Sequence, residues 1–277
     1  MELIFNGDVS LKDIPNDVDG LFTYDNTHLL DWNMFSRFRN LNNLQIHYAI
    51  IRCENDVPEI LIRNLKVLTL STTPSSDFDI IYSLANLESL FLVRDNLVHV
   101  DFLSPLRSLK TLNISHNNIK DLKVLESLKN LEILDCSYNR MSSIDPIAKL
   151  NKLKYLSCEE NGISSLEPLR NLTKLEYLDV SNNLIKSVEP LISLENLQIL
   201  YTSVRFFSST AKGLPENLTR IGVGYYIYNE NETPKIKEKS GTSKFRILKE
   251  ICLRKESGSY IGGWLKIENI ASLYKWF

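Results

Sequence analysis

Apolar side chains recur at a fixed interval through the middle of the chain. Three and five residues after a leading leucine comes a further apolar pair, such as Leu156 and Cys158 after Leu153, with polar Thr202 as the exception in the last coil. Since alternate residues of a strand point to the same face, each pair predicts a short β-strand with one buried side. Six leading leucines follow one another every 22 residues: Leu87, Leu109, Leu131, Leu153, Leu175 and Leu197.

The second half of each 22-residue unit, here called a coil, carries four more apolar positions. In the coil that begins at Leu109 these are Ile119, Leu122, Leu125 and Leu128. They predict a limb that turns the chain back towards the next strand, so that each coil closes over its own apolar side chains. One coil alone buries too little to be stable, and the coils must therefore stack on one another.

Asparagine and proline mark two fixed places in the coil. Eight residues after the leading leucine come Asn117, Asn139, Asn161 and Asn183, with Asp95 at this place in the first of the six coils. An amide group both donates and accepts, so it can satisfy the backbone groups of a tight, buried bend. Prolines fifteen residues after the lead, at 146, 168 and 190, suit the start of a short helical turn.

The unit L-x-x-L-x-L-x-x-N resembles the leucine-rich repeat family, and the match covers roughly half of the chain. Its 22-residue form with Pro168-Leu169 and Pro190-Leu191 is similar to the class found in bacterial internalins and in a phosphatase-1 regulatory subunit. The resemblance implies an α/β solenoid, right-handed and curved. It implies a parallel β-sheet on the concave face, short 3₁₀ or irregular convex segments, and terminal caps. This fold serves many unrelated functions.

The period extends beyond the six regular coils with less regular spacing. We expect degenerate repeats and a cap over residues 1–64, with Val18-x-x-Leu21-x-Thr23 as the first coil, and the solenoid proper over 65–204. Residues 205–277 should hold a last strand, Leu218-x-x-Ile221-x-Val223, and a C-terminal cap. Within that cap, the spacing of apolar residues predicts a basic amphipathic helix over 243–256 and a second helix over 264–277.

Charge is unevenly distributed, although the net charge is only −2. Residues 1–64 hold 5 Lys or Arg against 10 Asp or Glu, and residues 201–277 hold 13 against 7. The basic C-terminal part could bind nucleic acid or anionic lipid. A cap with a solvated basic face is the interpretation that we favour, because solenoids need caps.

The four cysteines do not indicate a metal site, because none forms a C-x-x-C pair. Cys136 and Cys158 take the same inward position in consecutive coils. A disulfide between them is one alternative, but we expect free core thiols. The first eight residues have neither a basic region nor an apolar run, so we expect no signal peptide, and no apolar run is long enough to span a membrane. We accordingly expect a cytoplasmic protein without a cofactor, or one delivered into a host cytoplasm.

The candidate binding surface is the concave face, which carries the residues two and four places after each lead, with residues just beyond the strand. Aromatic and acidic side chains gather there, and aromatic residues are enriched in the centres of protein interfaces. The plainer explanation is that strands favour aromatic and β-branched residues in any case. The candidates are Phe91, Ile133, Asp135, Tyr138, Tyr155, Glu159, Tyr177, Asp179 and Tyr201.

Two further patterns bear on the surface. The residue after each lead alternates in sign, from Lys66 and Glu88 to Lys154 and Glu176, which predicts ion pairs between neighbouring coils. His116 could approach Asp135 and Tyr138, but there is no nucleophile motif and no glycine-rich phosphate loop, so we do not expect an enzyme.

These observations favour a non-enzymatic protein-binding module or scaffold that takes a protein with a basic or mixed surface. The resemblance leaves two roles open, a regulatory subunit for an enzyme or a microbial effector that acts on a host protein. Binding of nucleic acid or an anionic membrane through the basic C-terminal segment is the third possibility.

Overall fold

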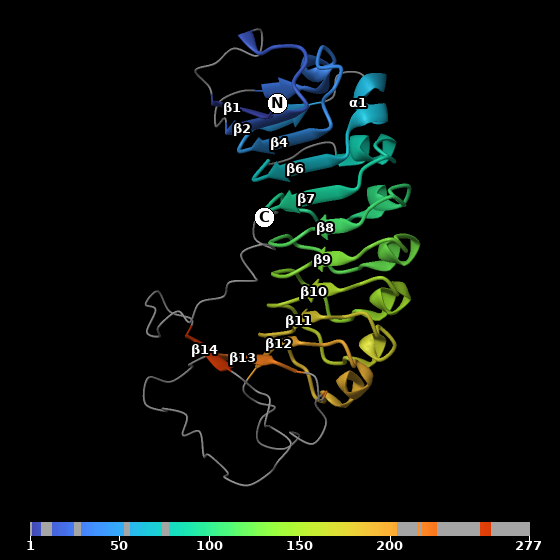
Figure 1. Ribbon diagram of the computed structural model, residues 1–277, viewed down its shortest axis with the longest axis vertical. Helices are drawn as coiled ribbons and strands as arrows, with labels where there is room; N and C mark the ends of the chain where they lie inside the picture. Colours follow the sequence, from blue (N-terminus) through green and yellow to red (C-terminus); the bar gives the residue numbers. More distant parts are fainter. Residues whose placement is uncertain are drawn as a thin grey trace.

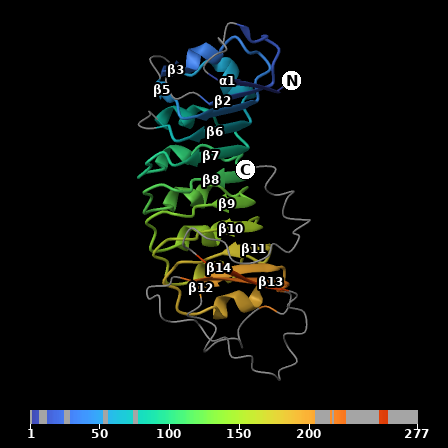
Figure 2. The ribbon, with the colours of Figure 1, turned by 90° about the vertical axis from the view of Figure 1, so that its left-hand side faces the viewer.

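The computed structural model describes residues 2–6, 13–24, 29–52, 56–73, 78–203, 215, 218–225 and 250–255. The described chain forms a long stack of coils, with a sheet along one side and short helical turns along the other (Figure 1). The sheet is parallel throughout and its 12 strands follow chain order, with only β3 and β5 set apart in a two-stranded parallel sheet of their own. Figure 2 shows the strands one above another in the view turned by 90°. This is the parallel solenoid that the sequence predicts.

The strands are short, three to six residues each. The first half of the chain forms β1 (Glu2–Asn6), β2 (Gly20–Tyr24), β3 (Leu29–Asp31), β4 (Asn43–His47), β5 (Ile50–Arg52), β6 (Val67–Ser71), β7 (Ser89–Val93) and β8 (Thr111–Asn113). The second half forms β9 (Ile133–Asp135), β10 (Tyr155–Ser157), β11 (Tyr177–Asp179), β12 (Ile199–Ser203), β13 (Arg220–Tyr225) and β14 (Glu250–Lys255).

The return limbs are one α-helix and a series of 3₁₀ turns. They are α1 (Glu59–Asn64), η2 (Trp32–Phe35), η3 (Phe78–Ser83), η4 (Asp101–Leu103), η5 (Lys123–Ser127), η6 (Asp145–Lys149), η7 (Glu167–Leu169) and η8 (Glu189–Ser193). The last three each have proline in their first two positions, where a fixed φ suits a helical start and the missing N–H has no partner to lose.

The 22-residue period fixes the register of the sheet. Leu134 pairs with Leu156 and Leu156 with Leu178, so equivalent residues stack directly. The leading leucines, the inward strand residues and the limb residues predicted for the coil of Leu109 are all buried in one continuous core. Cys136 and Cys158 lie in that core as free thiols, as predicted. Burial raises the pKa of both thiols, so they stay protonated and unreactive.

The bend asparagines work as expected. The Asn161 side-chain nitrogen donates to the carbonyls of Glu159 and Cys158 in its own coil, at 3.0 and 3.2 Å, and to that of Cys136 in the preceding coil, at 3.2 Å. Its oxygen accepts the Met141 N–H at 3.1 Å. Asn117, Asn139 and Asn183 repeat this arrangement. Each amide therefore joins two coils and satisfies backbone groups that have no place in the sheet.

Ion pairs between neighbouring coils form where the sequence alternates in sign. Glu88 accepts from Lys110 at 2.7 Å and lies 3.5 Å from Lys66, and Lys154 pairs with Glu132 at 2.7 Å. The pKa of Glu88 is lowered, first by its hydrogen bond from Lys110. These side chains are exposed, so each pair contributes only a few tenths of a kcal/mol.

The two ends of the solenoid depart from the expected pattern. The strand β1 precedes the coil of Val18, so that coil is not the first. Strand β1 pairs with β2, where Leu3 lies beside Leu21, a spacing of 18 residues instead of 22. The predicted helix over 243–256 is wrong at 250–255, which form β14 parallel to β13. The open edge of β13 offers unpaired backbone groups, and pairing with it outweighs the local helical spacing. Most of the basic segment and the second predicted helix lie outside the described residues.

The residue seven places after the lead has a left-handed backbone in seven successive coils. The φ angles lie between 53° and 62° at Tyr48, Thr72, Arg94, His116, Tyr138, Glu160 and Asn182. We call this set the left-handed column. Residues other than glycine, asparagine and aspartate adopt this conformation at a cost of about 1–2 kcal/mol. The backbone is held there by bonds between coils, such as that from the Tyr138 N–H to the Glu159 carbonyl at 2.8 Å.

Replacing Thr72 by asparagine should therefore stabilise the protein. Thr72 is the β-branched member of the column, with φ 56°, and asparagine tolerates this conformation better. The expected gain in the free energy of unfolding is about 1 kcal/mol. Urea denaturation followed by circular dichroism measures it, with Thr111→Asn on a regular strand as the control, where a loss is expected. Equal losses at both positions would show that the column carries no strain.

Candidate functional site

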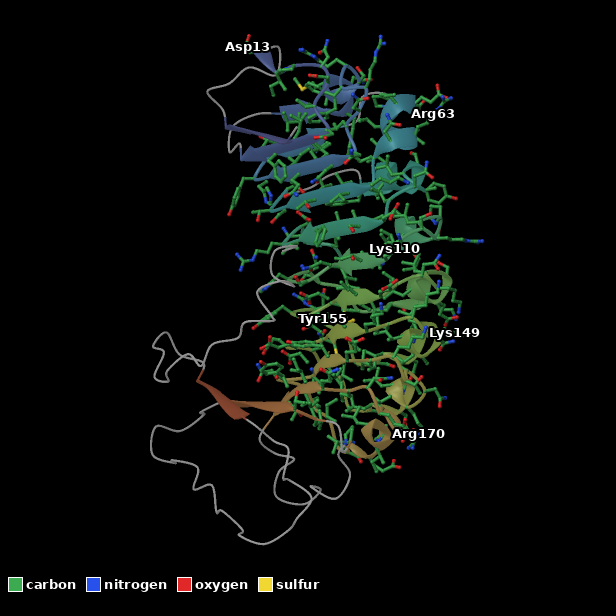
Figure 3. All side chains as sticks on the ribbon, in the orientation of Figure 1. Asp13, Arg63, Lys110, Lys149, Tyr155 and Arg170 are labelled. Atoms are coloured by element: carbon green, nitrogen blue, oxygen red, sulfur yellow. The ribbon has the colours of Figure 1, made fainter. Side chains whose placement is uncertain are left out.

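A row of stacked tyrosines lies on the concave face. The register sets Ile133, Tyr155, Tyr177 and Ile199 side by side on β9 to β12. The rings of Tyr155 and Tyr177 are stacked, with centroids 4.1 Å apart and planes 9° from parallel. Tyr201, from the neighbouring row, has its ring 5.7 Å from that of Tyr177 at 42°. Figure 3 shows Tyr155 on the sheet side of the solenoid, with Lys149 and Arg170 on the opposite side.

The three tyrosines are all half-buried, so their rings present part of their surface to the outside. The pKa of Tyr177 is raised above its ordinary value, first by burial and then by the neighbouring Tyr155 and Asp179. The phenol therefore stays neutral throughout the physiological range. The result is an aromatic surface across three strands, which we call the tyrosine cluster (Tyr155, Tyr177 and Tyr201).

The aspartates at the ends of β9 and β11, Asp135 and Asp179, accept hydrogen bonds from the serine two residues further along the chain. Asp135 accepts the backbone N–H of Ser137 at 3.0 Å and its hydroxyl at 2.6 Å, and Asp179 accepts the N–H of Ser181 at 2.9 Å. Asn113 makes the same bond to Ser115 one coil earlier than Asp135, at 2.9 Å. The repeated Asx turn gives Asp135 and Asp179 a structural role that the sequence reasoning missed. The recurring Asp/Asn-x-Ser spacing is the signal that could have revealed it.

Two acidic candidates are less accessible than predicted. Asp179 is 6% exposed and Glu159 is 7% exposed, whereas both were expected on an open acidic surface. The Glu159 side chain accepts from Asn182 at 3.3 Å in the next coil. Asp135 is half-buried, and burial raises its pKa despite the hydrogen bonds from Ser137. These carboxylates therefore expose less of their side chains than the sequence analysis assumed.

A second aromatic stack lies at the end of the strands. His116 and Tyr138, both in the left-handed column, have ring centroids 4.3 Å apart and planes within 6° of parallel. The pKa of His116 is lowered, first by burial and then by the charge of Arg94, so the imidazole is neutral at pH 7. Tyr138 thus takes part in an ordered aromatic pair with His116 of the preceding coil.

Phe91 is separated from the other candidates. It lies on β7 between Thr69 and Asn113, two strands away from Asp135. The structure brings together eight of the predicted residues on β9 to β12 and the bends that follow. Phe91 is placed on the same face but outside this group.

The described residues hold no group of three or more His, Cys, Asp or Glu side chains that could bind a metal ion. Nor does any helix in the described part of the chain have the length and apolar character to cross a membrane. His116 lies near Asp135 and Tyr138, but its ring stacks on the tyrosine.

Sequence families match the regular coils. The family described as "Leucine Rich repeats (2 copies)" matches residues 107–149 and 129–171, and that described as "Leucine Rich Repeat" matches 174–199. A search of curated proteins gave no match.

Solved structures with the same architecture come from bacteria and plants. Internalin C2 from Listeria monocytogenes is 28% identical, with a TM-score of 0.58, covering 64% of this chain and 77% of that one. A leucine-rich repeat protein from Leptospira interrogans is 25% identical, with a TM-score of 0.58, covering 66% and 49%. The leucine-rich repeat ectodomain of the receptor kinase GASSHO1/SCHENGEN3 from Arabidopsis thaliana is 22% identical, with a TM-score of 0.50, covering 69% and 25%.

The repeat spacing, the stacked parallel strands, the asparagine bends and the matched families agree on one classification. Residues 107–171 and 174–199 match leucine-rich repeat families, and the chain is similar in architecture to the internalin.

Proposed function

We propose that this protein is a binding module that holds a protein partner against the tyrosine cluster on its concave face. The observation that carries the proposal is the half-buried stack of Tyr155 on Tyr177, with centroids 4.1 Å apart on the neighbouring strands β10 and β11. Stacking fixes the rings before a partner arrives, so little side-chain entropy is lost on binding. Solenoids of this kind commonly use the concave surface for binding.

The charges around the cluster favour a partner with basic or mixed character. Asp135 and Asp179 end β9 and β11, and Glu159 and Glu160 follow the end of β10. Their negative potential attracts Lys and Arg and speeds association. It repels phosphates, so single-stranded nucleic acid is a poor fit for the same surface even though bases stack on tyrosine. With such a partner, the protein acts as a cytoplasmic scaffold or regulatory subunit, or as an effector delivered into a host cytoplasm.

The experiment is a capture from lysates with the full-length chain as bait, in three forms. The wild type and Lys186→Ala, an exposed residue away from the sheet, should retain the same protein, and the double variant Tyr155→Ala/Tyr177→Ala should lose it. Circular dichroism of each bait confirms that it is folded. Retention by the double variant would sink the proposal.

A second measurement addresses the other candidate, the basic C-terminal segment. Binding to single-stranded RNA and to vesicles with anionic lipid is measured over a range of salt concentrations, with the same three forms and with charge reversal at Lys235, Lys237 and Lys239. We expect weak binding that salt abolishes. Strong binding that only charge reversal removes would move the function from the tyrosine cluster to that segment.

A further inference from the structure

Asp95 occupies the bend position of its coil, which is asparagine in each of the four following coils. Its Oδ1 accepts the backbone N–H and the hydroxyl of Thr73 in the preceding coil, both at 2.8 Å. Asn117 Oδ1 accepts the Asp95 N–H in the same way, at 3.0 Å. One oxygen of the aspartate therefore reproduces the amide oxygen of the repeat. The side chain is only 2% exposed, so water does not complete its bonding.

The second oxygen of Asp95, Oδ2, stands where asparagine has its amide nitrogen, and an ionised carboxylate oxygen cannot donate as that nitrogen does. In the later coils that nitrogen donates to carbonyls two, three and 25 residues earlier, as Asn183 does to Ser181, Val180 and Cys158. The same spacing from Asp95 leads to the carbonyls of Val93, Leu92 and Leu70, which can only accept. Asp95 Oδ2 is buried and has no hydrogen-bond partner. An ionised carboxylate at this place would direct a negative oxygen towards carbonyl oxygens.

We propose that Asp95 is a neutral, protonated carboxylic acid in the folded protein, with its Oδ2 hydroxyl donating to these carbonyls in place of an amide nitrogen. The joint between the coils of β6 and β7 is then pH-sensitive, because loss of this one proton replaces a hydrogen bond by the repulsion of like partial charges. The remaining asparagine joints have no such proton to lose. Among the described coils, the solenoid thus contains one such joint, which weakens as the pH rises from acidic towards neutral.

The electrostatics of the joint agree with the geometry. The pKa of Asp95 is raised from 3.8 to about 7, chiefly by burial, with the two hydrogen bonds from Thr73 acting in the opposite direction. The described titratable groups on its own bend and the next are Arg94 and His116, and neither contributes to this shift. Because the pKa is higher in the folded state, the acid stabilises the fold fully below about pH 3.8. That contribution is lost as the pH rises towards and through about 7.

Asp95→Asn supplies the missing donor permanently and is the direct test. Urea denaturation of the full chain is measured from pH 4.5 to pH 9 for the wild type and the variant. The unfolding constant of the wild type, divided by that of the variant, should rise about tenfold per pH unit up to the folded-state pKa and then level off. As a matched control, Asn161→Asp should acquire the same dependence at another joint. A ratio that stays constant with pH would overturn the proposal.

The protonation itself can be observed in the wild type, whether or not a variant folds well. The side-chain carboxyl carbon of Asp95, assigned by ¹³C NMR, should titrate near pH 7, well above the range in which exposed aspartates ordinarily titrate. Titration of Asp95 together with the exposed aspartates would show that it is ionised in the folded protein and would refute the proposed joint.

Discussion

Asn139→Ala is expected to lower the free energy of unfolding by about 1–3 kcal/mol, the cost of leaving buried backbone groups unpaired. The Asn139 side-chain nitrogen donates to the carbonyls of Ile114, Cys136 and Ser137 at 3.0 to 3.1 Å, and its oxygen accepts the Ile119 N–H at 3.0 Å. Alanine replaces none of these bonds. Because the amide joins two coils, its loss also weakens the stacking on which each coil depends.

Urea denaturation followed by circular dichroism measures the change, and a surface asparagine provides the comparison. Asn130 donates one exposed bond to the Arg107 carbonyl, at 2.9 Å, and accepts from Lys152 at 2.7 Å. Asn130→Ala should therefore cost no more than about 0.5 kcal/mol. If the two variants lose the same stability, the bend asparagines are not the joints described above.

Tyr177→Ala should weaken partner binding about thirtyfold, which corresponds to the ~2 kcal/mol typical of a central interface tyrosine. Tyr177 is the middle ring of the cluster, in contact with Tyr155 on one side and Tyr201 on the other. Its removal takes away its own contact area and leaves both neighbours without support. Isothermal calorimetry with the captured partner measures the affinity of the folded variant.

Tyr177→Phe separates the ring from the hydroxyl. It keeps the stacked ring, so affinity should fall by less than about threefold if apolar contact dominates. Salt should slow association of the wild type without much effect on dissociation, because the nearby carboxylates act mainly on the encounter. An unchanged affinity in Tyr177→Ala would place the interface elsewhere on the molecule.

The regular coils could be predicted from the sequence because every coil repeats the same solution to the same packing problem. Leu134, Leu156 and Leu178 stack directly, and a fixed spacing leaves no other register that buries them all. The position of the tyrosines follows from the same period. Their stacking does too, because Tyr155 and Tyr177 occupy equivalent places on neighbouring strands.

Features that depend on interactions outside the period could not be predicted. The strand β14 forms because a partner edge is present, which the local spacing of residues 250–255 does not reveal. Glu159 is buried because the next coil covers it, with Asn182 donating to it at 3.3 Å. The sequence places Asp95 at the same position as the bend asparagines. Only the buried Oδ2, which has no hydrogen-bond partner, distinguishes it from them.

In the left-handed column, the backbone conformation does not depend on the type of side chain. Backbone bonds between coils hold that conformation, and residues as different as Arg94, His116 and Glu160 all adopt it. The side chain there can be exchanged without repacking the core. Each of these seven coils thus offers one exchangeable position at the end of its strand, and neighbouring members such as His116 and Tyr138 are in contact. Substitutions in this column, one residue per coil, could therefore change which partner the protein binds while the solenoid keeps its fold.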